Sequence, residues 1–103
     1  MNRKRLKNRR ENQTVDVEFG YKKFAVTIGF DGASKPKEVF TSSAKTGSDL
    51  DHLLADACVV LSLYLQNGGL ACELSDAMGR FENGEPASLI GALADLVAME
   101  DKA

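Results

Sequence analysis

The spacing of apolar residues changes near the middle of this 103-residue chain, and that change constrains its fold more than any other feature. Between residues 14 and 42 apolar and polar residues largely alternate, which is the period of half-buried β-strands. From residue 50 onward the spacing becomes three or four, the period of amphipathic helices. Strands followed by helices, without alternation of the two, predict an α+β domain in which helices cover one face of a sheet.

The first half is expected to form three strands, at residues 14–19, 24–30 and 37–42. Both connections are too short for a parallel crossover, so the strands should form an antiparallel meander. The second predicted strand places four apolar side chains on one face, those of Phe24, Val26, Ile28 and Phe30.

Three helices are expected in the second half. The first should begin near Leu50 after an N-cap at Ser48 and end at Asn67-Gly68-Gly69. A short helix should follow over residues 70–78, and a third should run from Pro86 to about residue 99, because proline suits a first helical turn. The predicted fold is therefore a three-stranded antiparallel sheet followed by three helices packed on one face (βββααα). The apolar face of the long helix is predicted to comprise Leu50, Leu53, Leu54, Ala57, Cys58, Leu61, Tyr64 and Leu65.

The near-neutral total charge of −2 hides a strong asymmetry. Residues 1–12 carry six basic groups and one acid, whereas the rest of the chain carries seven basic groups and fourteen acids. We therefore expect a flexible basic arm at residues 1–13 and a single acidic domain at residues 14–103. The arm could bind a nucleic-acid backbone, dock on an acidic protein surface, or serve only for solubility. Its candidate binding residues are Arg3, Lys4, Arg5, Lys7, Arg9 and Arg10.

A hydroxyl-rich loop precedes the long helix and is a candidate anion or nucleotide site. Free N–H groups at a helix N-terminus favour phosphates and carboxylates. The competing interpretation is a polar turn that merely caps the helix, since the spacing of a P-loop is absent. The candidate residues in this loop are Lys45, Thr46, Gly47 and Ser48.

The catalytic residue types are sparse, so no enzyme activity, metal or other cofactor is expected. His52 is the single histidine and has no cysteine or serine at a spacing typical of a triad or metal centre. Cys58 and Cys72 do not form a CxxC pair and are expected to be buried, reduced thiols. Without an apolar run of roughly 20 residues or a hydrophobic segment after the basic N-terminus, a cytoplasmic location without membrane insertion is expected.

A homodimer is also expected, because the first predicted strand offers more apolar surface than a monomer of this size needs. The side chains concerned are those of Val15, Val17 and Phe19.

Four segments, taken in order, resemble the TSCPD domain family. The family shows a strand and turn, then "G-x-P-x-E-V-F", "G-K-x-G-S-D-L" and a long helix with "S-L-x-L-Q-x-G". The corresponding segments of this chain are Val26–Gly32, Pro36–Phe40, Lys45–Leu50 and Leu61–Gly68. The resemblance covers about residues 14–98, and it departs from the family where Pro86–Ala92 replaces the Ser-Cys-Pro-Asp segment.

The resemblance implies a setting in ribonucleotide reduction, because the family forms a C-terminal part of some adenosylcobalamin-dependent reductases and also occurs as free-standing proteins. The catalytic barrel of a reductase is absent from this chain. Two functions therefore remain open. One is a non-catalytic accessory or regulatory module that binds a protein, such as a reductase, or a nucleotide. The other is a small nucleic-acid-associated protein that uses the basic arm.

Overall fold

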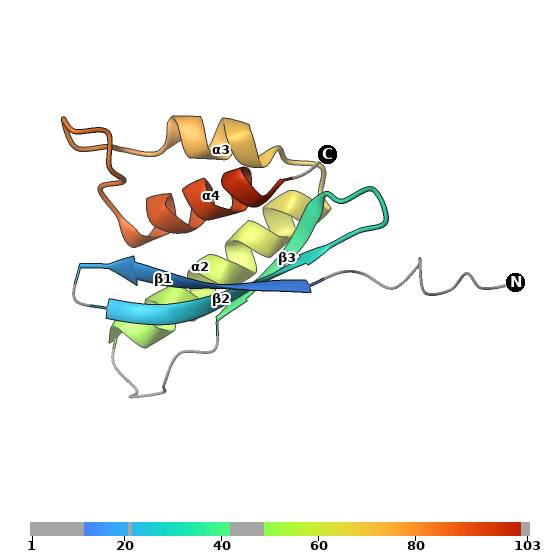
Figure 1. Cartoon of the computed structure of the whole chain (residues 1–103), viewed down its shortest axis with the longest axis horizontal. Coiled ribbons are helices and arrows are strands. Elements are labelled where there is room, and N and C mark those ends of the chain that lie inside the picture. The colour runs from blue at the N-terminus through green and yellow to red at the C-terminus, as the bar shows by residue number, and fades with distance from the viewer. Residues whose placement is uncertain (1–11, 21, 42–48, 102–103) are drawn as a thin grey trace, which may run out of the picture.

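The computed structural model describes residues 12–20, 22–41 and 49–101, and its strands form one antiparallel sheet (Figure 1). The sheet has the order β1-β2-β3, which confirms the predicted meander. Its members are β1 (Asn12–Phe19), β2 (Lys22–Phe30) and β3 (Pro36–Thr41). β1 begins two residues earlier than predicted, because Asn12 and Gln13 pair with Gly29 and Ile28 of β2.

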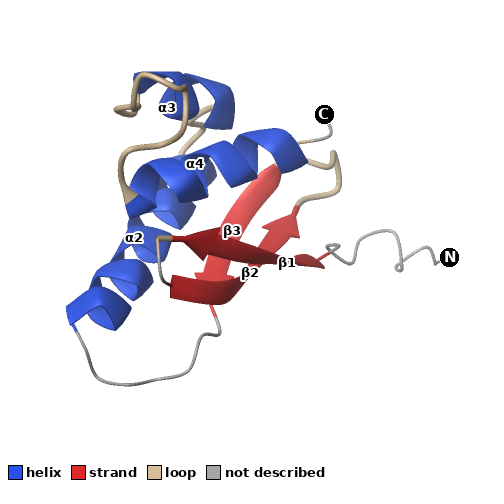
Figure 2. Ribbon diagram, turned by 60° about the vertical axis from the view of Figure 1, so that its left-hand side comes forward, coloured by secondary structure: helices blue, strands red, loops and turns tan. Residues whose placement is uncertain are grey.

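Three helices follow the sheet, as predicted. They are α2 (Asp49–Gln66), α3 (Ala71–Ala77) and α4 (Leu89–Glu100). Figure 2 shows all three on the same side of the sheet, with α3 stacked on α4 as the outermost layer. α2 runs beside β3 and packs closely against that strand.

A single apolar core joins the sheet to the helices. All four apolar side chains predicted to share one face of β2 are buried, which confirms the period-2 interpretation of that strand. Leu54 and Leu61 of α2 meet them from one side, and Leu93 and Val97 of α4 complete the same cluster. The sheet and the two longer helices therefore depend on one another for burial of their apolar faces.

β1 alternates between half-buried and exposed positions along its whole length. Val15, Val17 and Phe19 pack against the core on the helix side of the sheet, whereas Thr14 and Asp16 are exposed on the opposite face. Apolar side chains of β1 thus belong to the core face, and the outer face of this strand is polar.

The C-terminus of α2 is where the glycine-rich stop predicts it. The Gly69 amide donates to the Tyr64 carbonyl at 2.9 Å, and the Gly68 amide donates to the Leu65 carbonyl at 3.1 Å. Gly68 has a φ of 92°, so these bonds form a Schellman motif around a left-handed residue. Leu70 then leads directly into α3.

The start of the last helix differs from the prediction. α4 begins at Leu89, and its N-cap is Ser88, whose Oγ accepts a hydrogen bond from the Gly91 amide at 3.0 Å. Pro86 forms an isolated antiparallel bridge with Arg80. The Phe81 amide donates to the Glu85 carbonyl at 2.9 Å and the Ala87 amide donates to the Gly79 carbonyl at 3.0 Å, so the bridge does not need the N–H group that proline lacks. Here this pairing competes successfully with helix initiation.

Candidate functional site

Both predicted binding segments lie outside the described residues. These are the basic arm (Arg3, Lys4, Arg5, Lys7, Arg9 and Arg10) and the loop Lys45, Thr46, Gly47 and Ser48. β3 ends at Thr41 and α2 begins at Asp49, so the loop connects that strand to the helix N-terminus. Its use as an anion site, and that of the arm as a nucleic-acid site, stay predictions.

Polar side chains of α2 occupy the outer edge of β3. The Val39 amide donates to Ser62 Oγ at 2.9 Å, and the same hydroxyl lies 3.3 Å from the Val39 carbonyl, to which it can donate. Gln66 Nε2 donates to the Lys37 carbonyl at 3.0 Å, and Lys37 Nζ donates to the Leu65 carbonyl at 3.2 Å. We call these four contacts the β3–α2 seam. Three of them satisfy backbone groups of β3 that would otherwise face solvent at a sheet edge, and the fourth satisfies a carbonyl in the last turn of α2.

The seam brings together two motifs that are far apart in the sequence. Val39 belongs to the Glu-Val-Phe segment and Ser62 and Gln66 belong to the segment of α2 that resembles the family helix. Side chains four residues apart lie on the same face of a helix, which is why Ser62 and Gln66 both reach β3. The motif residues therefore have a structural role.

The outer face of α2 carries large apolar side chains that the core does not cover. Leu53 is 50% exposed, Val60 65% and Leu63 54%. Their spacing of seven and three residues places them on one stripe of the helix. Val59 of the next stripe and Phe40 of β3 are also exposed. We call these five residues the α2 patch. A contiguous group of this kind on a small domain is typical of a protein-binding surface.

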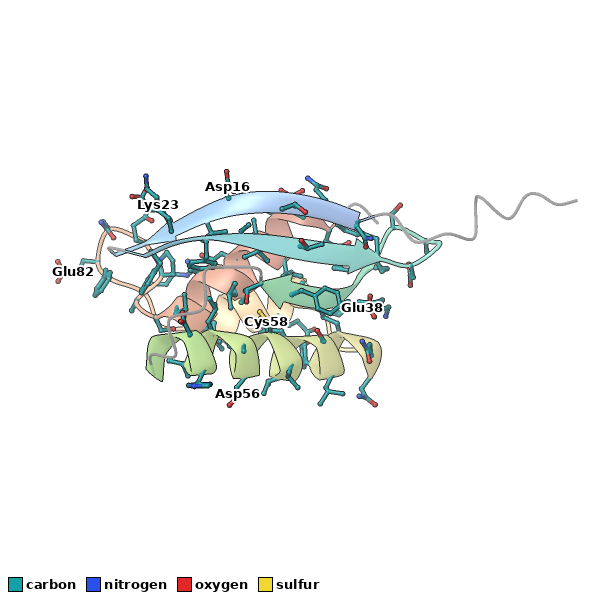
Figure 3. All side chains as sticks on the ribbon, turned by 90° about the horizontal axis from the view of Figure 1, so that it is seen from below. Asp16, Lys23, Glu38, Asp56, Cys58 and Glu82 are labelled. Atoms are coloured by element: carbon teal, nitrogen blue, oxygen red, sulfur yellow. The ribbon has the colours of Figure 1, made fainter. Side chains whose placement is uncertain are left out.

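A groove borders the patch on each side of α2. One groove, of about 350 Å³, lies between α2 and the last two helices and is lined by Leu53, Val60, Tyr64, Leu74 and Ile90. Its walls are almost wholly apolar. The second, of about 340 Å³, lies between β3 and α2 and includes Phe40, Val59 and Leu63. Figure 3 shows Asp56 on the outside of α2, while Cys58 of the same helix points into the protein.

The sequence prediction missed this patch because it assigned Leu53 to the core. The signal was present in Val59-Val60, since a helix that turns Leu54, Cys58 and Leu61 toward the core places both of these valines on its opposite side. Ile90 of the last helix is likewise 37% exposed, although its neighbour Leu89 is buried. In both helices the apolar surface is wider than the core needs.

The two cysteines have different surroundings. Cys58 is buried in α2, as predicted, and burial raises the pKa of its thiol to about 11. Cys72 is exposed, so its predicted burial is wrong. The short helix α3 buries Ala71 and Ser75, four residues apart, and Cys72 follows Ala71 by about 100° around the axis. His52 is exposed in the first turns of α2.

An ion pair holds the long connection between α3 and α4. Arg80 Nη1 donates to Asp95 Oδ2 at 2.8 Å and Nη2 donates to Oδ1 at 2.7 Å. Ser75 Oγ lies 2.6 Å from Asp95 Oδ1, and Arg80 Nη1 also reaches the Gly84 carbonyl at 3.1 Å. The hydrogen bonds from Arg80 lower the pKa of Asp95, and Asp95 raises the pKa of Arg80. The carboxylate and the guanidinium bind each other through two parallel hydrogen bonds, an arrangement that suits a structural role. We call this ion pair the clamp.

The described part of the chain contains no group of three His, Cys, Asp or Glu residues positioned to hold a metal ion. Within the same residues, no helix has the length and apolar character needed to cross a membrane. The apolar patch and its two grooves are therefore the most distinctive surface that these residues offer for a partner.

Comparisons with known proteins bear on family and not on chemistry. Searches of curated proteins and of solved structures found no significant match. A family model does match, and it covers residues 2–99. The match spans nearly the whole chain and includes β3, the β3–α2 seam and α2. This protein belongs to the TSCPD domain family.

Proposed function

We propose that this protein is a non-catalytic accessory module that binds a protein partner through the α2 patch. The observation that carries the proposal is the exposure of Leu53, Val60 and Leu63 along one stripe of an 18-residue helix. Leaving such side chains in water costs free energy that a partner would recover by covering them. The flanking grooves offer depressions for apolar side chains of that partner.

The partner is expected to work in ribonucleotide reduction. The support for this is membership of the TSCPD family together with the resemblance to the C-terminal part of some reductases. A reductase subunit, or a protein that regulates one, would supply the chemistry. The module would contribute recognition, and its role would be accessory or regulatory.

Site-specific photo-crosslinking in the native cell tests this proposal. A photoreactive residue at Val60 should crosslink to a reductase subunit, whereas the same residue at the exposed loop position Glu82 should not. A companion Leu63→Asp change should abolish the Val60 crosslink without unfolding the protein, because Leu63 is half exposed. Equal crosslinking from Val60 and Glu82, or none from Val60, would contradict docking through the patch.

The charge asymmetry favours a second candidate function, binding of a nucleic-acid backbone through the basic arm. Six basic groups among the first twelve residues would give strong dependence on salt. Since β1 begins at Asn12, deletion of residues 1–11 removes all six basic groups and keeps every residue of the described sheet. Loss of DNA or RNA binding in that deletion, measured at two salt concentrations, would support this function. Unchanged binding would exclude it.

A nucleotide is the remaining ligand class, through Lys45, Thr46, Gly47 and Ser48. Titration with nucleoside phosphates and with inorganic phosphate should then move the amide signals of residues 45–49. Signals that stay in place at millimolar ligand would remove this site from consideration.

A further inference from the structure

The two edges of the sheet differ in how they are protected. The seam covers the outer edge of β3, where Ser62 and Gln66 bond to backbone groups. β1 forms the opposite edge and pairs with no described strand except β2. It is eight residues long, contains no proline, and keeps an unbroken register. A long regular edge of this kind is a template for another strand.

The register shows which backbone groups β1 presents outward. Val39 bonds to Ser62, so its N–H and C=O point away from β2. Its cross-strand partner Ile28 therefore points toward β1, where it pairs with Gln13. Alternation along the strand then leaves every second residue of β1 with outward N–H and C=O groups. These residues are Asn12, Thr14, Asp16 and Glu18.

The side chains of β1 are also incompletely covered. Val15, Val17 and Phe19 pack against the core on their inner sides but remain half-buried. A strand added beside β1 would cover these side chains on the core face and would satisfy the outward backbone groups. The strand that matches both requirements has apolar residues on one face and polar residues on the other, which is the pattern of β1 itself.

We infer that a second copy of this chain pairs antiparallel with β1, so that the two sheets join into one of six strands about a two-fold axis at Val15. This interface is independent of the α2 patch. Figure 3 shows Asp16 on the β1 side of the molecule and Asp56 on the opposite, α2 side. Both surfaces can therefore be occupied in the same molecule.

The charged side chains of β1 favour this register over the alternative registers in which the two-fold axis lies at a nearby residue. An axis at Asp16 would set two Asp16 carboxylates directly opposite each other, and an axis at Val17 would set Asp16 opposite Glu18. Like charges directly opposite destabilise a strand pair. With the axis at Val15, Asp16 faces Thr14 of the other copy and Glu18 faces Asn12, both of which can donate hydrogen bonds. An axis at Thr14 would pair only residues 12–16 of β1.

A cysteine placed on the axis tests the register. Val15 would face Val15 of the other copy in a non-hydrogen-bonded pair, with Cα atoms about 4.5 Å apart, a distance that a disulfide can span. In a Cys72→Ser background, Val15→Cys should form a disulfide-linked dimer on mild oxidation. Val17→Cys is the matched control, because its two copies would be roughly 13 Å apart. Crosslinking of Val17→Cys and not Val15→Cys would overturn the register.

A proline tests the strand pairing itself. The Asp16 amide points outward, so Asp16→Pro removes a bond to the second copy while sparing those to β2. Wild type should sediment as a dimer, Asp16→Pro as a folded monomer, and Asp16→Ala, which keeps the N–H group, as a dimer. A wild type that stays monomeric at high concentration overturns the inference. So does a dimer that survives Asp16→Pro but is lost in Val60→Asp, since that result places the interface on the α2 patch.

Discussion

The hydroxyl of Ser62 on α2 contacts both the amide and the carbonyl of a single β3 residue, Val39, at 2.9 and 3.3 Å. A hydroxyl can accept one hydrogen bond and donate another, so one small side chain satisfies both backbone groups. The two residues are 23 positions apart in the sequence. Their contact fixes the long helix against the edge of the sheet, and Leu53, Val60 and Leu63 of the α2 patch are exposed on a different face of that helix.

Replacing Ser62 by alanine should weaken the fold. The change leaves the amide and carbonyl of Val39 without their partner in a partly buried seam. We expect a loss of about 1–2 kcal/mol in the free energy of unfolding, measured by urea denaturation. Glu82→Ala, at an exposed loop position, should change stability by less than about 0.5 kcal/mol. Equal stability of the two variants would show that water replaces the hydroxyl without cost.

A methyl group at Gly69 should also destabilise the protein. An added Cβ would run into the ring of Tyr64, whose hydroxyl donates to the Leu70 carbonyl at 2.9 Å. We expect Gly69→Ala to cost about 1–3 kcal/mol in thermal or urea unfolding. Gly79→Ala is the matched control, because nothing lies within 4 Å of a Cβ at that position. A cost confined to Gly79→Ala would contradict the packing described for the Tyr64 ring.

The clamp between Arg80 and Asp95 should make stability depend on pH in the acid range. Arg80 lowers the pKa of Asp95 in the folded protein, so the stabilisation is complete above the ordinary value of 3.8. It is lost as the pH falls through the lowered folded value. The difference in unfolding free energy between wild type and Asp95→Asn should therefore be constant from pH 7 to about 5 and shrink on further acidification.

The control for this experiment is the double variant in which Arg80→Met and Asp95→Asn are combined. Arg80→Met added to Asp95→Asn should have a smaller effect than Arg80→Met alone, because the two side chains act through each other. Additive effects, or a wild-type advantage that grows toward pH 3, would contradict the clamp.

The two thiols should react at very different rates. Cys72 is exposed, whereas Cys58 is buried and has its pKa raised to about 11. Only the thiolate is nucleophilic, so one equivalent of iodoacetamide should be consumed by the native protein at pH 8 and two after unfolding. Cys72→Ser should show no rapid labelling when folded. Prompt labelling of Cys58 in the native protein would show that α2 opens readily.

The β-sheet was predictable because the alternation of apolar and polar residues determines which side chains of a strand face the core. Alternation in β2 assigned Phe24, Val26, Ile28 and Phe30 to the core face, and all four are buried. The short connections left only an antiparallel order. The end of α2 was equally well marked, since Gly68 supplies the left-handed residue that its C-terminus requires.

The features that were missed depend on tertiary pairing. Pro86 fits a helix start by local preference, but its bridge to Arg80 moves the N-cap to Ser88. Burial of Cys72 depends on which face of a two-turn helix meets α4, and seven residues give too short a pattern to decide it. The α2 patch escaped prediction because Leu53 fits the apolar spacing whether or not the core has room for it.

The seam also limits how far this protein can assemble. Strand addition continues into a fibre when every molecule has two open sheet edges, since each added molecule then exposes its second edge to the next molecule. Ser62 and Gln66 bond to backbone groups at the β3 edge, so β1 is the edge of the described sheet at which a further strand can be added. In the pairing proposed for β1, association through strands would then end at two copies. Two polar side chains of α2 thus hinder growth of the sheet at β3.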